Sequence, residues 1–130
     1  MAYRLLVLAM AALLALDAAA QIATQKDTTK GVTVAVTPGN LAAGAKTWDF
    51  AIVLDTHSQE FSDDLAQSAV LVDDRGNEFK ALAWDGAAPG GHHRSGVLRF
   101  NAIEPRPQAL ELRISRPGEA GARIFRWRLQ

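Results

Sequence analysis

Large apolar residues recur at every second position along most of the chain. The clearest case is the run "WDFAIVLD" over 48–55, in which apolar side chains alternate with smaller or acidic ones. Further short runs of this kind cover 32–36, 68–72, 79–84, 95–100, 109–115 and 123–129. A period of two is typical of β-strands, which turn successive side chains to opposite faces. Because turn residues separate the runs, we predict one all-β domain, an antiparallel sandwich of about seven strands.

Two of the connections carry local signals of their own. "DDRGNE" between 68–72 and 79–84 reads as a hairpin turn, in which Gly76 supplies a positive φ. "SQEFSDDLAQ" contains Ser62 followed by two acidic residues, which favours a single helical turn capped by Ser62. We expect this turn to lie in the connection between the two sheets.

The first twenty residues are typical of a secretory signal peptide. Arg4 precedes a twelve-residue apolar run, and Ala18 and Ala20 form an A-x-A cleavage pattern before Gln21. The run is shorter than the roughly 20 residues that a membrane span needs, so we expect no membrane span after cleavage, although an uncleaved anchor is the alternative. The polar segment 21–30 has no periodicity and is expected to be a flexible lead. The sandwich domain is then 31–130, and its location periplasmic or secreted.

Composition narrows the class of protein. The chain contains no cysteine, so an exported domain of this size relies on packing alone, without disulfides. Its formal net charge is zero, which gives no indication of nucleic acid as a partner. Acidic residues nevertheless prevail between 49 and 78, and eight arginines follow from 94 onward. Either acidic and basic strands pair with each other, or the chain has a bipolar docking surface.

The three histidines are predicted to share one end of the sandwich. In an immunoglobulin-type arrangement, 48–55 and 95–100 are antiparallel neighbours in one sheet. The first strand ends in "LDTHS" and the second begins after "GGHHRS". His57 is therefore expected close to His92 or His93, at a pole that also carries the loops 56–64 and 116–121.

These histidines are candidate metal ligands. His57 with His92 or His93, completed by a carboxylate or water, would suit Zn²⁺ or Cu²⁺. The alternative is that all three are loop residues that hydrogen-bond the backbone at strand ends. Ser58 and Ser95 lie near histidines in sequence, but there is no G-x-S-x-G motif and no recognisable triad, so we expect no enzymatic activity.

Three longer boxes carry a family resemblance: "WDFAIVLDTHS", "LVDDRGNEFKALAWDG" and "GGHHRSGVLRF". Together they resemble small extracytoplasmic bacterial domains and, more loosely, the immunoglobulin-like modules of secreted and lipid-anchored bacterial proteins. The resemblance covers roughly 31–115 and implies an immunoglobulin-like sandwich in the cell envelope. It also implies a shared feature at His57, His92 and His93, but no particular activity. The lipid-attachment cysteine of many such modules is absent from this chain.

Two functions follow as expectations. The first is an exported, non-enzymatic binding or interaction module of the bacterial cell envelope, which contacts another envelope protein through the pole with His57, His92 and His93. The alternative is a periplasmic protein that binds a divalent metal, copper or zinc, through the same histidines.

Overall fold

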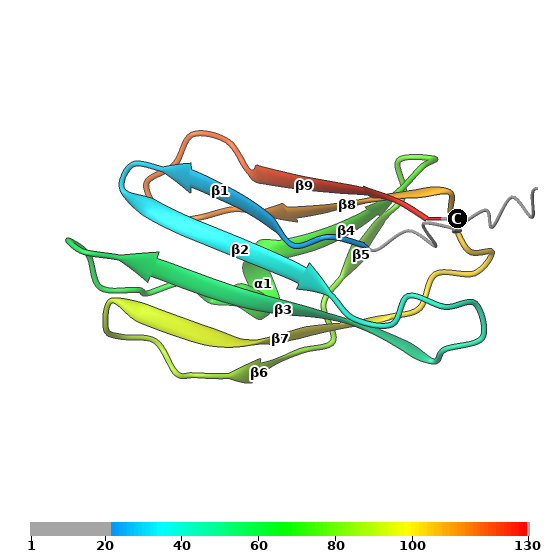
Figure 1. The fold of residues 1–130 in the computed structure, drawn as a ribbon, viewed down its shortest axis with the longest axis horizontal. Helices are drawn as coiled ribbons and strands as arrows, with labels where there is room; N and C mark the ends of the chain where they lie inside the picture. Colours follow the sequence, from blue (N-terminus) through cyan, green and yellow to red (C-terminus); the bar gives the residue numbers. More distant parts are fainter. Residues whose placement is uncertain (1–21, 130) are drawn as a thin grey trace, which may run out of the picture.

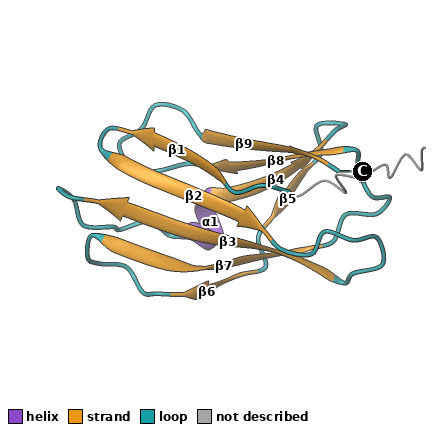
Figure 2. Ribbon diagram, viewed as in Figure 1, coloured by secondary structure: helices purple, strands orange, loops and turns teal. Residues whose placement is uncertain are grey.

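The computed structural model describes residues 22–129, and the expected signal peptide over 1–20 lies outside them. Two antiparallel sheets form two layers (Figures 1 and 2). One has five strands in the order β1-β2-β3-β7-β6, and the other has four in the order β5-β4-β8-β9. The elements are β1 (Gln25–Thr29), β2 (Val32–Pro38), β3 (Thr47–Thr56), α1 (Leu65–Ser68), β4 (Ala69–Asp73), β5 (Glu78–Lys80), β6 (Ala83–Gly86), β7 (His93–Asn101), β8 (Ala109–Ile114) and β9 (Arg123–Arg128). The all-β prediction is confirmed, with nine strands in the described part where about seven were expected.

The alternation of the strands builds the core between the layers. On β3 the apolar side chains of the period-two run are fully buried: Trp48, Phe50, Ile52 and Leu54. The ring of Phe50 meets Phe100 of β7 edge-on and Trp127 of β9 at a tilt, each at 5.7 Å between centroids. Each such buried side chain contributes roughly 1.5–3 kcal/mol of transfer free energy. The large side chains of β3 thus join both sheets.

The predicted strand 79–84 is wrong as a single element. Its first part, β5, pairs with β4, and its second part, β6, pairs with β7 of the other sheet. The chain crosses between the layers at Leu82, whose amide donates to the carbonyl of Arg99 at 2.7 Å and which is 52% exposed. Both parts are short edge strands, which offer little free edge to another chain.

The expected flexible lead over 21–30 contains strand β1, which pairs with β2 from Gln25 to Thr29. Its inward side chains meet backbone groups and not apolar core. The side-chain amide of Gln25 accepts from the amide of Arg126 at 3.0 Å and donates to the carbonyl of the same residue, and the indole of Trp127 donates to the carbonyl of Ala23 at 2.8 Å. β1 therefore covers the free edge of β9. Its sequence shows no hydrophobic period because this contact is polar.

The two predicted connections form, one with a different cap. α1 is a single helical turn before β4, and its N-cap is Asp64, not Ser62, with the Asp64 carboxylate accepting from the amide of Gln67 at 3.4 Å. The β4–β5 turn is a hairpin turn as predicted, with Gly76 at a φ of 83°. Within 22–129 no helix combines the length and hydropathy that crossing a membrane requires.

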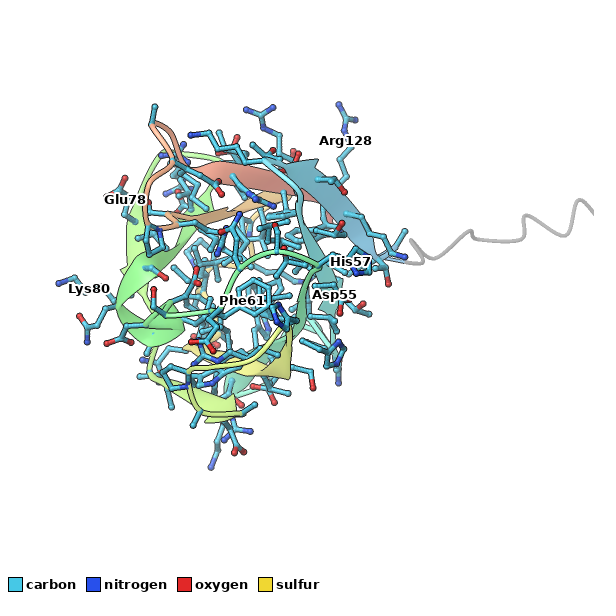
Figure 3. All side chains as sticks on the ribbon, turned by 90° about the vertical axis from the view of Figure 1, so that its left-hand side faces the viewer. Asp55, His57, Phe61, Glu78, Lys80 and Arg128 are labelled. Carbon is cyan, nitrogen blue, oxygen red and sulfur yellow. The ribbon has the colours of Figure 1, made fainter. Side chains whose placement is uncertain are left out.

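The connecting loops gather at the two ends of the sandwich (Figure 1). We call the end formed by 30–31, 57–64, 87–92 and 115–122 the histidine pole. The opposite end, formed by 39–46, 74–77 and 102–108, is the terminal pole, because both ends of the described chain lie there (Figure 1). Figure 3 looks onto the histidine pole.

Candidate functional site: the histidine pole

The predicted strand neighbours bring the histidine-bearing segments together. β3 and β7 are antiparallel, with Asp55 directly opposite His93. One residue further, the amide of Thr56 donates to the carbonyl of His92 at 2.9 Å. His57 therefore follows β3 at the place where β7 begins, as the sequence predicted.

His93 and Asp55 form an exposed pair on the outer face of the five-stranded sheet. Nδ1 of His93 contacts Oδ1 of Asp55, and the two side chains are 64% and 54% exposed. His57 and His92 are also exposed, and Figure 3 shows His57 beside Asp55 at the rim of this end. Within 22–129 no group of three or more histidine or carboxylate side chains is gathered closely enough to hold a metal ion.

A buried ion pair lies beneath the exposed rim. Asp63 of the β3–α1 loop accepts two hydrogen bonds from the guanidinium of Arg116, at 2.9 and 3.1 Å. Their side chains are 0% and 5% exposed. A bidentate pair fixes the relative orientation of its partners as well as their distance. Asp63 and Arg116 therefore hold the 57–64 loop against the 115–122 loop.

The ion pair extends into a second arginine. Glu119 accepts from Arg116 at 3.0 Å and from Arg123 at 2.8 Å. The guanidinium of Arg123 also donates to the carbonyls of Asp27, Thr29 and Val32, at 2.8–3.1 Å. The hydrogen bonds from Arg123 are the main reason that the pKa of Glu119 lies below its usual value. Arg123 thus ties the β1–β2 hairpin to the same network.

A third buried arginine fixes the remaining loop. Arg94, 3% exposed, donates to the carbonyls of Ala87 at 2.9 Å and of Asp63 at 2.5 Å. Its guanidinium lies 5.2 Å from the ring centroid of Trp84, a distance at which a cation is attracted to the ring face. Arg94 joins the 87–92 loop to the residue that pairs with Arg116.

Phe61 closes the space between these loops. Its side chain is 1% exposed and lies at the centre of the pole in Figure 3. Its amide donates to the carbonyl of Gly91 at 3.2 Å, and its carbonyl accepts from the amide of Gly90 at 2.7 Å. Gly90 and Gly91 have φ values of 126° and 72°, which favour glycine. The "GG" before the two histidines therefore shapes a loop that pairs with Phe61.

The sequence predicts that the loops carrying Asp63, Arg116 and Glu119 lie at this pole, but it does not predict that these side chains are buried together. The burial of two of the arginines could have been predicted from the alternation of residue types along their strands. Arg94 shares the phase of Leu98 and Phe100 on β7, and Arg123 shares that of Phe125 and Trp127 on β9, so both point inward. An arginine at an inward position at the start of a strand indicates a buried guanidinium with polar partners in the adjoining loops.

Part of the uneven charge along the chain is paired across neighbouring strands. Asp49 accepts from Arg99 across β3 and β7 at 3.0 Å, and Glu111 accepts from Arg126 across β8 and β9 at 2.6 Å. The hydrogen bond from Arg126 is the largest cause that lowers the pKa of Glu111. Two further acids of the stretch 49–78 pair with later arginines, at Asp63–Arg116 and Glu78–Arg113, as the first interpretation expected.

Several cavities open away from the histidines. Four, of about 300 to 570 Å³, are lined by residues of the terminal pole and of the adjoining face of the four-stranded sheet, among them Asp74, Arg106 and Arg128. No protein-family model, curated protein or solved structure matches this chain with significant similarity. The function must therefore be argued from the site.

Proposed function

We propose that this chain is an exported, non-enzymatic binding module of the bacterial cell envelope that contacts another envelope protein through the histidine pole. The observation that carries the proposal is the buried network under that pole. Four chain segments meet there, and the side chains of Asp63, Arg116, Glu119 and Arg123 join three of them. Loops held in one conformation before binding lose less entropy when a partner docks.

The position of the chain ends supports the same surface. Both ends of the described chain lie at the terminal pole (Figure 1). A tether attached there, whether a retained signal anchor or another segment, leaves the histidine pole facing away from the attachment point. The exposed side chains of His57, His92 and His93 would then form the contact surface.

The sheet order supports an immunoglobulin-like type. The neighbours β2-β3-β7-β6 and β4-β8-β9 agree with the ABED and CFG sheets of that fold when β2 is taken as its first strand. β1 and β5 are additions to this set. In such sandwiches the loops of one end commonly form the binding surface.

Site-specific photo-crosslinking in the producing cells tests this function. A photoreactive residue at Ser58 or His92 should give a discrete adduct with one envelope protein. The matched position Arg75, exposed in the β4–β5 turn of the terminal pole, should not. Adducts of equal yield and identity from both poles would contradict the proposal.

Binding of Zn²⁺ or Cu²⁺ is the second candidate, and the Asp55–His93 contact favours it. A carboxylate on one ring nitrogen orients the imidazole and leaves the other nitrogen for a metal. His57 lies on the neighbouring segment. Micromolar Zn²⁺ or Cu²⁺ should then raise the melting temperature of the parent protein and not of His57→Ala. Equal shifts for both proteins would assign the histidines a structural or contact role alone.

A further inference from the structure

The outer face of the four-stranded sheet has a hollow beside the terminal pole. Its volume is about 430 Å³, and residues of β4, β8, β9 and the β4–β5 turn line it. Neighbouring positions across these strands form rows along its floor. One row joins Val72, Glu111 and Arg126. The next row, nearer to the terminal pole, joins Ala109 and Arg128.

The floor of the hollow is apolar although it lies on the outer side of the sheet. Leu71 belongs to the core between the layers, so the alternation of β4 turns Val72 outward. Val72 is nevertheless only 2% exposed, because the walls of the hollow enclose it. Ala109 creates the free space, since its single methyl group lies between the longer side chains of Glu111 and Arg128. An apolar group fits this floor better than a polar one.

The carboxylates around the hollow already hold hydrogen bonds from the chain. Glu111 accepts from Nε of Arg126 at 2.6 Å and from Nη2 of Arg113 at 2.9 Å. Asp73 accepts from two backbone amides and one side-chain amide of its own turn, at 2.8–3.0 Å. Asp74 accepts from a backbone amide of the neighbouring loop at 3.0 Å. The acids of the lining are therefore occupied by donors of their own chain.

Two arginines of β9 keep donors for a ligand. Arg126 uses Nε for Glu111, and its terminal nitrogens make no hydrogen bond in the described part of the chain. Arg128 is exposed, and among residues 22–129 its guanidinium has neither a hydrogen bond nor an ion pair. Figure 3 shows its side chain reaching outward from β9. The two arginines share one face of the strand about 7 Å apart, and guanidinium groups match the geometry of a carboxylate.

We propose that this hollow binds a small monocarboxylic acid with an apolar body, as its carboxylate anion. The carboxylate accepts from the free guanidinium nitrogens of Arg126 and Arg128. The apolar body lies along Ala109, where the methylene groups of the two arginines extend the apolar lining. The opposite wall carries Asp73 and Asp74, which repel a second carboxylate. The charges on the two walls therefore favour an acid with one carboxylate over an acid with two.

The dimensions of the hollow set the size of this ligand. Its volume is at the lower end of the range of about 300–1,000 Å³ that is typical of small-molecule sites. β4 and β9 are two strand spacings apart, about 10 Å, which an unbranched acid of about eight carbons spans. A ligand with so few atoms binds weakly, so we expect a dissociation constant of about 0.1–1 mM. The site is separate from the histidine pole, and the proposal goes beyond the proposed function and does not depend on it.

Titration of the purified protein with sodium octanoate, followed by amide chemical shifts, tests the proposal. Saturable shifts should appear at 72–76, 109–111 and 126–128, and not at the histidine pole. Three compounds of the same chain length serve as comparisons: octan-1-ol lacks the charge, octylammonium reverses it, and octanedioate adds a second carboxylate. Each should bind at least about tenfold more weakly than octanoate, because each loses the guanidinium contact or meets the acidic wall.

Two pairs of variants test the residues. Arg128→Gln should raise the dissociation constant for octanoate about tenfold. Arg75→Gln is its control and should bind like the parent, because Arg75 is another exposed arginine of the terminal pole but does not line the hollow. Ala109→Phe should abolish saturable binding by filling the space. Its control is Ala51→Phe, at an exposed position of the other sheet, and the amide spectrum of each variant checks that it is folded.

Four results would overturn the proposal. The first is the absence of saturable shifts at the hollow up to about 5 mM octanoate. The second is equal affinity for octanoate and octan-1-ol, because the arginines would then recognise nothing. The third is an equal loss in Arg75→Gln and Arg128→Gln, which would indicate general attraction by positive charge. The fourth is octanoate binding that survives Ala109→Phe.

Discussion

The two poles of the sandwich are both made of loops, but different contacts hold them. At the histidine pole, buried charged groups join loops that are distant in sequence, through Asp63, Arg116 and Arg123. At the terminal pole, single side chains bond to the backbone: Arg106 donates to the carbonyl of Leu41 at 2.8 Å, and the amide of Gln108 donates to Asp74 at 3.0 Å. The difference indicates that the loops of the histidine pole are held more tightly than the formation of simple hairpin turns would require.

Buried ion pairs are a poor means of gaining stability, because removing two charges from water costs nearly as much as their attraction returns. We infer that the network under the histidine pole instead specifies a single loop arrangement. Arg116 reaches Asp63 only when the 57–64 and 115–122 loops are both in place.

The largest effect is expected from Asp63→Asn. The substitution removes one of the two carboxylates that pair with the buried guanidinium of Arg116 and leaves Glu119 as the other. Breaking a buried pair by removing one partner typically costs about 3–5 kcal/mol. Because Glu119 still pairs with Arg116, urea unfolding should show a loss near the lower end of this range in the free energy of unfolding.

Asp49→Asn is the matched control for that experiment. Its partner is also an arginine, Arg99, but both side chains are about 40% exposed. An exposed pair adds little to stability because water solvates its charges well. If the two variants lost equal stability, the contrast between buried and exposed pairs would be wrong.

Gly96→Ala should have the next largest effect. A Cβ at position 96 would lie 2.6 Å from Cα of Gly86, 2.7 Å from Cζ2 of Trp84 and 2.8 Å from the carbonyl oxygen of Asp85. Relief requires movement of β6 or of the indole that Arg94 stacks on, at a cost of about 1–3 kcal/mol. Thermal unfolding measures the loss. Gly121→Ala is the control, because open space surrounds Gly121, and a lower melting temperature there would point to a general intolerance of side chains.

Much of the fold could be predicted from the alternation of residue types. The run 48–55 gave β3 and its buried face, and the neighbouring of β3 and β7 followed from the topology. β1 could not be found in this way, because Gln25 and Asp27 face inward to polar partners and leave no apolar pattern. The division of 79–84 depends on which sheet each half joins, and that is decided by contacts distant in sequence.

The sequence predicted where the candidate site lies but not which buried side chains form it. Histidines draw attention in a sequence because they bind metals and titrate, whereas an arginine is expected at the surface. Arg94 is buried because two loops supply backbone carbonyls to it, and Arg123 because three chain segments supply carbonyls or a carboxylate to it. The alternation of residue types along a strand shows that such an arginine points inward. It does not show the polar groups that compensate for removing its charge from water.

Acid should weaken the contribution of Glu119 to the histidine pole. Glu119 has a lowered pKa because Arg123 and Arg116 donate to its carboxylate. Its contribution is therefore fully present above the usual glutamate pKa of about 4.3, and it is lost as the pH falls below that value through the lowered pKa of the folded state. Stability should be flat from pH 7 to 6 and decline below about pH 5. In Glu119→Gln the decline should be shallower; an unchanged decline would show that other carboxylates cause it.

The smallest effect is expected from His57→Ala and His92→Ala. Both side chains are exposed and lie outside the buried network, and such substitutions usually change stability by less than about 0.5 kcal/mol. Their melting temperatures should match the parent in the absence of metal. A large loss would mean that the histidines hold the pole together, which the account assigns to the arginines.

Amide hydrogen exchange tests most directly whether the histidine pole is a single fixed surface. The amides of Phe61 and Gly90 bond across two loops at this pole. They should exchange as slowly as amides in the β3–β7 ladder, and Asp63→Asn should abolish their protection while the ladder stays protected. Rapid exchange of these two amides in the parent protein would contradict the account, because the loops would then lack the fixed arrangement proposed for binding.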